Sequence, residues 1–340
     1  MTPTQEMEQG KQQADTFAQV KMRAAMISGL LRRTASTLVI KAGPNNPMVR
    51  AMMRIRCHPL VLKFERDHVD VSKDGRTIRL AAKHFPYAHD MVEHFDLYFN
   101  QVVPEKGGAG LLVDYSGPKL QRYKNGLEFE LSSLPEEIEA IGEYFHWYKA
   151  KPDDLIFDIG AYCGVTAYHL SKLVPEGKVC SFEPDPVNFR LLTRNIERHG
   201  LKNVTPLPFG IADKTEKAAV FLSEGTMGSR LERHSTRMTV GDVCSVQTLS
   251  LADACARFGV PKFVKVDIEG SEIEMLAAAA PFLRSNSIQL AVDTNHWVNG
   301  KLTGPAVEEI LRSCGYETDS DDAVGFMTTW ARPRALRKAA

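Results

Sequence analysis

LIFDIGAYCG, residues 155–164, decides the fold together with SFEP, residues 181–184. In the first stretch an apolar run ends in Asp158, and a glycine turn follows; in the second, another apolar run ends in Glu183. Between them, residues 165–173 carry apolar side chains at helical spacing. The pattern predicts a strand, a turn, a helix and a second strand, with a carboxylate at the tip of each strand. Such a unit typically binds a small molecule that carries a nucleoside, which favours an enzyme over a scaffold.

The composition is that of a globular protein with a sizeable core. Of 340 residues, 44% are hydrophobic and 25% charged, which suits one large domain with an appendage, or two domains. Lys+Arg and Asp+Glu both number 42, and this balance argues against a nucleic-acid partner because such proteins are usually basic. The six cysteines form no C-x-x-C pair and are typical of buried thiols in a reducing compartment. Without an apolar run of about 20 residues or a secretory signal, we expect a cytoplasmic protein with no membrane span.

Residues 1–105 differ from the rest, and we expect them to form an accessory region of helices and strands. Residues 14–36 combine helical apolar spacing with basic side chains, which predicts a basic amphipathic helix that packs on its own protein. Residues 68–80 predict a hairpin around an Asp-Gly turn, and residues 89–102 predict an amphipathic helix. EKGGAG, residues 105–110, predicts a flexible break and marks the expected domain boundary.

Residues 106–340 are expected to form the second domain, with its core at residues 135–333. A second hairpin is predicted over residues 123–131 and a helix over residues 135–148. From residue 152 onward strands and helices alternate, which predicts a parallel sheet covered on both faces. The predicted strands are 154–158, 179–183, 204–208, 262–267 and 287–293, and the helices between them include 165–173 and 186–199.

The end of the chain has a different pattern. A helix is predicted over residues 304–314, followed by strands at 316–319 and 325–331. A short polar loop joins these two strands, and a parallel return would need a longer crossover. We therefore expect the last two strands to pair antiparallel.

The turn after the first predicted strand indicates which nucleoside cofactor fits. A dinucleotide-binding turn reads G-x-G-x-x-G, whereas here Gly160 and Gly164 stand four apart with Ala161 and Tyr162 after the first. Those side chains would crowd the pyrophosphate of NAD. S-adenosylmethionine has no phosphate; Asp158 suits its ammonium group, and the free N–H groups of the next helix suit its carboxylate. The acid at the second strand tip can accept hydrogen bonds from both ribose hydroxyls.

Four segments of the chain resemble the FkbM family of S-adenosylmethionine-dependent methyltransferases. They are FDIGAYCG (157–164), residues 181–204, FGIAD (209–213) and VKVDIEGSEIEML (264–276). The last is the most specific, because a strand that ends in K-x-D-x-E-G-x-E is unusual. The resemblance covers residues 135–333 and implies the α/β class I methyltransferase fold, Rossmann-like, with a seven-stranded, mostly parallel sheet whose last strand is antiparallel. It also implies methylation of hydroxyl oxygens on sugars, glycans or secondary metabolites.

The resemblance further implies roles for individual residues. Asp267, at the tip of the fourth strand, is expected to face the sulfonium and the acceptor, and Glu269 follows it into the active-site loop. The positions expected to bind the cofactor, besides Asp267, are Asp158, Gly160, Ala161, Tyr162, Gly164, Glu183, Pro184, Ala212 and Asp213.

An alcohol acceptor must lose a proton during methyl transfer, which requires a base. His296, in AVDTNHW just past the fifth predicted strand, is the candidate because a neutral imidazole accepts a proton near pH 7. Asp267 and Glu269 are rivals for this role. No metal is expected, although Asp267, Asp293 and Asn295 at adjacent strand tips could together hold magnesium.

Two other function classes stay open at this point. One is a non-catalytic module that binds adenosylmethionine, which the intact acids and glycines argue against. The other is a nicotinamide-dependent oxidoreductase, which the missing middle glycine argues against. The polar connection at residues 224–241 could fold over the site and meet an anionic acceptor. The expected partner is a small-molecule or glycan hydroxyl acceptor, and a homo-oligomer is left open.

Overall fold

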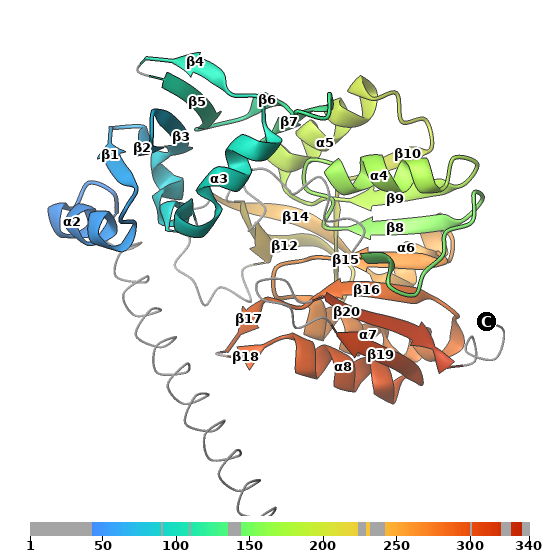
Figure 1. Cartoon of the computed structure of the whole chain (residues 1–340). Coiled ribbons are helices and arrows are strands. Elements are labelled where there is room, and N and C mark those ends of the chain that lie inside the picture. Colours follow the sequence, from blue (N-terminus) through green and yellow to red (C-terminus); the bar gives the residue numbers. More distant parts are fainter. Residues whose placement is uncertain are drawn as a thin grey trace, which may run out of the picture.

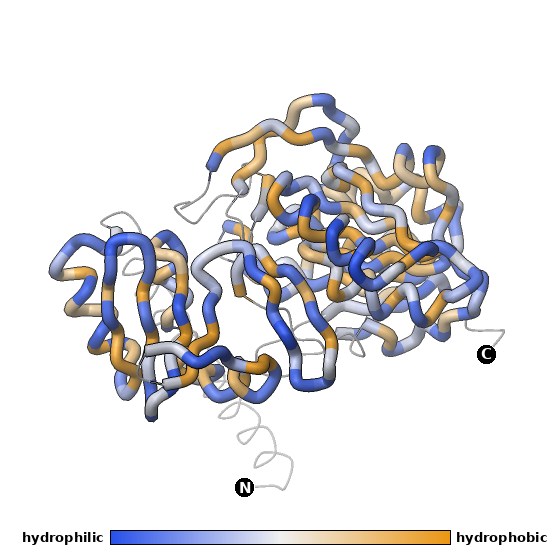
Figure 2. Tube along the Cα trace, turned by 90° about the horizontal axis from the view of Figure 1, so that it is seen from above, coloured by the Kyte–Doolittle hydropathy of each residue, from blue (hydrophilic) through white to orange (hydrophobic). Residues whose placement is uncertain are grey.

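The computed structural model describes residues 43–89, 91–108, 110–134, 144–223, 229–231, 242–299, 301–320 and 328–334. An N-terminal part with its own sheet lies beside a larger α/β part, as Figures 1 and 2 show from two directions. The basic helix predicted over residues 14–36 lies outside the described residues, as does most of the helix predicted over residues 135–148.

The N-terminal part is built on a five-stranded sheet with the order β1-β2-β3-β5-β4. Its strands are β1 (Val61–Phe64), β2 (His68–Lys73), β3 (Arg76–Ala81), β4 (Glu105–Gly107) and β5 (Gly110–Tyr115), and its helices are α2 (Pro47–Arg56), the 3-10 helix η1 (Ala82–Ala88) and α3 (Met91–Gln101). The hairpin predicted over residues 68–80 is confirmed, because β2 and β3 pair antiparallel. The helix predicted over residues 89–102 is confirmed as α3.

The first sheet continues past the boundary expected between residues 105 and 106. β5 pairs in parallel with β3, and β4 pairs antiparallel with β5 at the sheet edge. The glycine-rich segment expected to be a flexible break therefore contributes two strands to the sheet. We propose that the division between the two parts lies after residue 131 instead.

A second hairpin connects the two parts. Its strands β6 (Lys119–Arg122) and β7 (Glu128–Leu131) pair antiparallel, as the Asn-Gly turn predicts. Asn195, buried on the neighbouring helix, accepts a hydrogen bond from the backbone N–H of Glu130 (2.8 Å) and donates one to its carbonyl (2.9 Å). The same amide donates to the carbonyl of Cys163 (2.8 Å). One buried side chain thus joins the hairpin to the glycine turn of the larger part.

The larger part contains a seven-stranded sheet with the order β10-β9-β8-β15-β16-β20-β19. Its strands are β8 (Leu155–Ile159), β9 (Lys178–Phe182), β10 (Val204–Leu207), β15 (Phe263–Val266), β16 (Gln289–Asp293), β19 (Tyr316–Ser320) and β20 (Thr328–Pro333). β20 pairs antiparallel with both of its neighbours, whereas the pairs from β10 to β16 are parallel. The predicted class I methyltransferase sheet, with its last strand antiparallel, is confirmed.

Helices cover both faces of this sheet. They are α4 (Val165–Leu173), α5 (Pro186–Arg198), α6 (Leu251–Phe258), α7 (Glu272–Ser285) and α8 (Gly304–Ser313). α4 and α5 pack on one face, against Ile156, Val179 and Phe263; α6, α7 and α8 pack on the other, against Phe157 and Val264. Because both faces are covered, the central strands are apolar throughout, as is usual for parallel sheets.

A four-stranded sheet beside the main one was not predicted. It contains β11 (Phe209–Ala212), β12 (Glu216–Ser223), β13 (Arg230–Leu231) and β14 (Asp242–Ser250), in the order β11-β14-β12-β13. A small ribbon of β17 (Trp297–Val298) and β18 (Lys301–Leu302) follows β16. Most of the polar connection at residues 224–241 lies outside the described residues, but Ser229 and Leu231 are placed.

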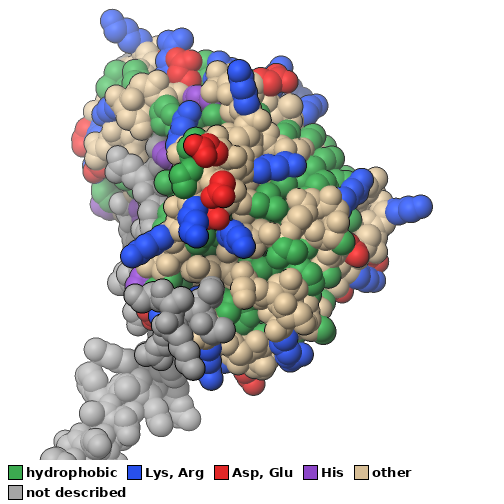
Figure 3. All heavy atoms as spheres, turned by 90° about the vertical axis from the view of Figure 1, so that its right-hand side faces the viewer, with side chains coloured by type: hydrophobic (Ala, Val, Ile, Leu, Met, Phe, Trp, Pro, Cys, Tyr) green, Lys and Arg blue, Asp and Glu red, His purple; other side chains and the backbone are tan. Residues whose placement is uncertain are grey.

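The surface carries charges of both signs. On the face shown in Figure 3, basic and acidic side chains are interspersed among polar and apolar ones. Among the described residues, none of the helices has the length and apolar character needed to span a bilayer.

Candidate active site

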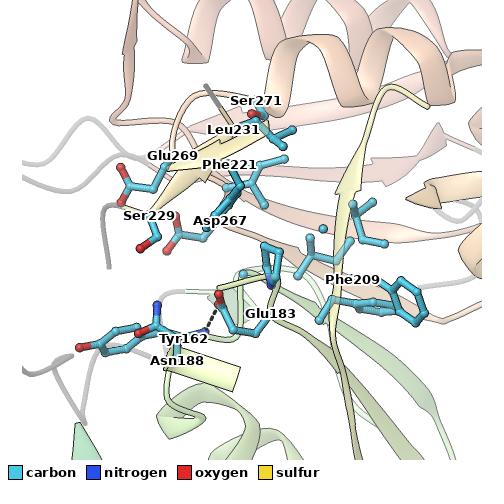
Figure 4. Close-up of a pocket in the computed structure, with 17 residues that line it drawn as sticks. Tyr162, Glu183, Asn188, Phe209, Phe221, Ser229, Leu231, Asp267, Glu269 and Ser271 are labelled. Atoms are coloured by element: carbon cyan, nitrogen blue, oxygen red, sulfur yellow. Dashed lines mark hydrogen bonds between the residues drawn. The ribbon is translucent and has the colours of Figure 1, made fainter. Parts of the chain in front are cut away.

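A pocket lies at the carboxyl ends of β8, β9 and β15, the edge of a parallel sheet at which ligands usually bind. Figure 4 shows Glu183 and Tyr162 on one side of it and Asp267 and Glu269 on the other. Six of the predicted site residues line this pocket, and they are Gly160, Tyr162, Glu183, Pro184, Asp267 and Glu269. The others do not line it, and they are Asp158, Ala161, Gly164, Ala212, Asp213 and His296.

The glycine turn brings two strand ends into close approach. Gly160 has φ +76°, and a Cβ atom there would lie 1.7 Å from the backbone oxygen of Asp267. Only glycine fits this position, because any side chain would overlap the end of β15. Gly164 has φ +90° and begins α4, where a Cβ would lie 2.7 Å from Leu192. The turn thus fixes the spacing between β8, β15 and α5.

Glu183 is the buried acid at the tip of β9. One carboxylate oxygen accepts a hydrogen bond from the backbone N–H of Tyr162 and the other from that of Asp185, each at 2.8 Å. Burial raises the pKa of this carboxyl to about 8. A carboxylate has about four acceptor positions, so two further hydrogen bonds from a ligand can reach it in the pocket.

Asp158 does not reach the pocket, and the direct contact expected with a ligand ammonium is not supported. Its side chain is fully buried, and its Oδ1 lies 3.9 Å from Nζ of Lys265. Ser181 donates a 3.4 Å hydrogen bond to its other oxygen. Burial raises the pKa of Asp158, and the charge of Lys265 opposes that rise. Asp158 therefore acts inside the sheet, as a partner of Lys265.

The K-x-D-x-E-G-x-E motif forms one loop between β15 and α7. Glu272 is fully buried, and its Oε1 accepts hydrogen bonds from the backbone N–H groups of Ile268 (3.2 Å) and Gly270 (3.1 Å). Glu269 has the left-handed φ of +55° that this tight loop requires. Burial alone would raise the pKa of Glu272, but the charge of His296 and the hydrogen bonds lower it below its usual value. The loop holds Asp267 and Glu269 at the pocket.

His296 lies behind the pocket wall, surrounded by acids. Its Nδ1 is 2.9 Å from Glu272 Oε1, and its Nε2 is 3.7 Å from Asp267 Oδ1 and 3.6 Å from Glu269 Oε2. Burial alone would lower the pKa of His296, but these three carboxylates raise it well above 6.5. These carboxylates favour the protonated ring, and the role of His296 as the base stays a prediction.

The alternative magnesium set of Asp267, Asp293 and Asn295 stays a prediction. Among the described residues, the group whose ligand atoms lie within 4.8 Å of one another is Asp267, Glu269 and His296. Asp293 is buried and accepts a 3.3 Å hydrogen bond from the backbone N–H of Asn295. Burial and the charge of Asp267 raise the pKa of Asp293 to about 7.

An apolar wall of the pocket was missed by sequence reasoning. Phe209, Ile211, Phe221 and Leu231 form it, together with smaller neighbours. In the FGIAD segment (209–213), the last two residues, Ala212 and Asp213, were predicted to contact the cofactor. In the structure the first three residues, Phe209 to Ile211, line the pocket instead. Phe221 and Leu231 gave no local signal, because they reach the site only through the unpredicted four-stranded sheet.

Three polar lining residues, Asn188, Ser229 and Ser271, were also missed. Asn188 follows the N-cap of α5 and accepts a 2.8 Å hydrogen bond from Ser132. Ser229 donates a 2.7 Å hydrogen bond to Asp185 and so attaches part of the long connection to the start of α5. The Asp185-Pro186 pattern marks the start of α5 in the sequence and could have indicated Asn188. No local sequence pattern indicated Ser229.

Comparison with known proteins relates part of the chain to methyltransferases. Residues 158–318 match the family model described as the methyltransferase FkbM domain. The hexuronic acid methyltransferase AglP of Haloferax volcanii is 30% identical over 139 residues, which are 40% of this chain and 54% of that protein. The chain therefore spans about half the length of this relative.

Solved structures of methyltransferases are similar at low identity. An FkbM methyltransferase from Methylobacillus flagellatus has 14% identity and a TM-score of 0.40, over 83% of this chain and 59% of that one. A precorrin-6y C5,15-methyltransferase from Geobacter metallireducens also has 14% identity and a TM-score of 0.40, over 60% and 94%. These scores are low, so the fold is assigned from the strand order above. Residues 158–318, slightly less than half of the chain, thus match an FkbM methyltransferase domain.

Proposed function

We propose that this protein transfers a methyl group from S-adenosylmethionine to a hydroxyl oxygen of a sugar, glycan or secondary metabolite. The observation that carries the proposal is Glu183: a buried carboxylate with spare acceptor positions, at the end of β9 and open to the pocket. The family match and the relative that acts on a hexuronic acid support a sugar-containing acceptor.

The pocket fits this cofactor part by part. Glu183 can accept hydrogen bonds from both hydroxyls of a ribose. The apolar wall of Phe209, Ile211 and Phe221 suits an aromatic base, which gains free energy on leaving water. Because Gly160 has no side chain, backbone atoms line the pocket at this position. Bound there, S-adenosylmethionine supplies a methyl group on a positively charged sulfur, which is a good leaving group.

The chain's own residues have three tasks in this reaction. The pocket walls exclude water and hold the acceptor in line, which lowers the entropic part of the barrier. The carboxylates of Asp267 and Glu269 face the pocket and place negative charge beside a cationic ligand. We propose that one of these two carboxylates accepts the proton of the acceptor hydroxyl, because both line the pocket whereas His296 does not.

Methyl transfer from tritiated S-adenosylmethionine tests the proposal. The purified chain is incubated with a panel of hexuronic acids, neutral sugars, glycans and hydroxylated polyketides, and products are analysed for radioactivity and for the mass of one added methyl group. Transfer to at least one hydroxylated acceptor is expected. Calorimetric titration with S-adenosylmethionine and S-adenosylhomocysteine separates the alternatives: binding without transfer to any acceptor would favour a binding module, and no binding of either would overturn the proposal.

A further inference from the structure

Three ligand-forming side chains meet at the wall of the pocket, two of which line it. Oxygens of Asp267 and Glu269 and a ring nitrogen of His296 all lie within 4.8 Å of one another. The two acids come from the loop after β15, and the histidine follows β16, so the neighbouring strands bring them together. We propose that these three residues bind one divalent first-row metal ion, of which Mn²⁺ is the best match. This departs from the expectation that the protein holds no metal.

The distances between these atoms suit a shared ion better than direct hydrogen bonds. His296 Nε2 lies 3.7 Å from Asp267 Oδ1 and 3.6 Å from Glu269 Oε2. Both separations are too long for hydrogen bonds, which end near 3.2 Å. Two ligand atoms bonded to one ion at about 2.1 Å lie about 3.0 Å apart at an octahedral angle and about 3.4 Å apart at a tetrahedral angle. A shift of a few tenths of an ångström therefore places an ion between them.

The histidine is oriented as a metal ligand. Its Nδ1 lies 2.9 Å from Glu272 Oε1, so a carboxylate stands beside that nitrogen. Nε2 lies between Asp267 and Glu269 and is the nitrogen available to bind an ion, which it does in its unprotonated form. Histidine ligands usually have such a carboxylate partner on the second ring nitrogen. Glu272 is itself held by two backbone N–H groups.

Negative charge exceeds positive charge around this point. Asp267, Glu269 and Glu272 all lie within 4 Å of the ring of His296. Lys265 Nζ is 3.7 Å from Oδ2 of Asp267, whereas His296 approaches Oδ1 of the same carboxylate. Glu272 Oε2, in a side chain with no exposed surface, has no hydrogen-bond partner among the described residues. A divalent cation would offset this excess, which the histidine alone cannot do.

The donor set indicates the type of ion. Two carboxylate oxygens suit Mg²⁺, Ca²⁺ and Mn²⁺, whereas an imidazole nitrogen suits Fe²⁺, Zn²⁺ and Ni²⁺. Mn²⁺ accepts both kinds of ligand, and three protein ligands leave positions open for water or substrate oxygen. Since Asp267 and Glu269 line the pocket, an oxygen atom of a ligand in the pocket can fill such a position. This inference goes beyond the proposed methyl transfer, because ion binding requires neither cofactor nor acceptor.

Titration with Mn²⁺, followed by loss of the EPR signal of the free ion, tests the proposal on the full chain. One ion per chain is expected for the wild type. His296→Ala should weaken binding at least about 100-fold, and Glu272→Gln about 10–100-fold, as loss of an outer partner usually does. His68→Ala is the matched control, since His68 also lies beside two acids, Asp67 and Asp70, on the N-terminal sheet. It should bind Mn²⁺ as tightly as the wild type.

The outcomes separate this proposal from the proposed function. Wild-type protein that leaves the Mn²⁺ signal unchanged at millimolar ion overturns the metal site, as does equal binding by the wild type and His296→Ala. Affinity for S-adenosylmethionine, measured by calorimetry on the same samples, reports on the proposed function independently. Circular dichroism checks that each variant is folded. Glu269→Gln, at a partly exposed ligand, replaces His296→Ala if that variant unfolds, and the same loss of Mn²⁺ binding is expected.

Discussion

Lys265 donates a 2.9 Å hydrogen bond through its buried ammonium group to the backbone carbonyl of Gly160. The same group lies 3.9 Å from Asp158 and 3.7 Å from Asp267. The lysine of the K-x-D-x-E-G-x-E motif and the glycine turn are 105 residues apart in sequence, yet they form one polar unit beneath the pocket. Because the ammonium, the carboxylate and the carbonyl are all out of water, each depends on the others.

We expect Lys265→Met to destabilise the protein strongly. The substitution leaves the carboxyl of Asp158 and the carbonyl of Gly160 buried without the ammonium group, and breaking a buried ion pair typically costs about 3–5 kcal/mol. Urea unfolding measures the change. Lys202→Met, at an exposed position, is the control and should change stability by less than about 0.5 kcal/mol. Adding Asp158→Asn to Lys265→Met should recover part of the loss; a further loss would contradict the pairing.

Gly160→Ala should be far more harmful than the same change in an open turn. At Gly160 a methyl group would overlap the backbone oxygen of Asp267, whereas at Gly126, with φ +88°, nothing lies within 4 Å. Gly126→Ala therefore carries only the left-handed backbone penalty of about 1–2 kcal/mol. Gly160→Ala adds displacement of the loop after β15. Urea unfolding measures the stability of both variants, and calorimetry measures their affinity for S-adenosylhomocysteine. Similar losses in Gly160→Ala and Gly126→Ala would refute the close approach of Gly160 to Asp267.

Glu183→Gln should weaken the binding of S-adenosylmethionine. The amide keeps the size of the side chain but removes the negative charge that strengthens hydrogen bonds from ribose hydroxyls, each worth about 1.5–3 kcal/mol when one partner is charged. We expect a loss of about 10–100-fold in affinity by calorimetry. Glu197→Gln, on the exposed side of α5, is the control. Unchanged affinity in Glu183→Gln would remove this residue from the ribose site.

The affinity for S-adenosylmethionine should rise with pH. Burial raises the pKa of Glu183 to about 8 in the free protein, so the ionised form that accepts the ribose hydroxyls is a minority at pH 7. We expect binding to tighten by up to about tenfold per pH unit below pH 8 and to level off above it. Glu183→Gln should show none of this dependence. A flat wild-type profile between pH 6 and 9 would be inconsistent with the buried acid as ligand.

The same pKa shift has the opposite effect on the stability of the free protein. The folded state holds the proton of Glu183 up to about pH 8, whereas the unfolded chain releases it near pH 4.5. The contribution of this group to the free energy of unfolding therefore falls as pH rises between these values. Urea unfolding of the wild type and Glu183→Gln at pH 5 and pH 8 measures the difference. If the difference in free energy of unfolding between the wild type and Glu183→Gln is the same at pH 5 and pH 8, the prediction is contradicted.

Much of the candidate site follows from strand tips in the sequence. Glu183 was predicted because an acid at the end of a buried strand lies at the carboxyl edge of the sheet. Asp267 and Glu269 were implied by the resemblance to the FkbM family, and all three residues line the pocket. Asp158 satisfies the same pattern but is turned inward, since successive side chains of a strand point to opposite faces. Its ion-pair partner, Lys265, lies on another strand. The sequence around Asp158 therefore does not indicate that its side chain points inward.

The pKa of His296 could not be predicted from the residues next to it in the sequence. Its position after the fifth predicted strand was correct, but its proton affinity depends on three carboxylates from the loop that follows β15. The pKa of an imidazole is set by charges within a few ångströms, whatever their distance in sequence. No pattern around residue 296 contains that information.

The sequence by itself determined the alternating strands and helices of the main sheet, the antiparallel last strand and the glycine turn, because apolar periodicity and glycine act over a few residues. Only the tertiary structure decided that the N-terminal sheet extends to residue 115, that Phe221 and Leu231 close the pocket, and that Asp158 lies beneath it. These features depend on which distant strands pair and on which face each side chain takes, and both are settled by packing of the whole chain.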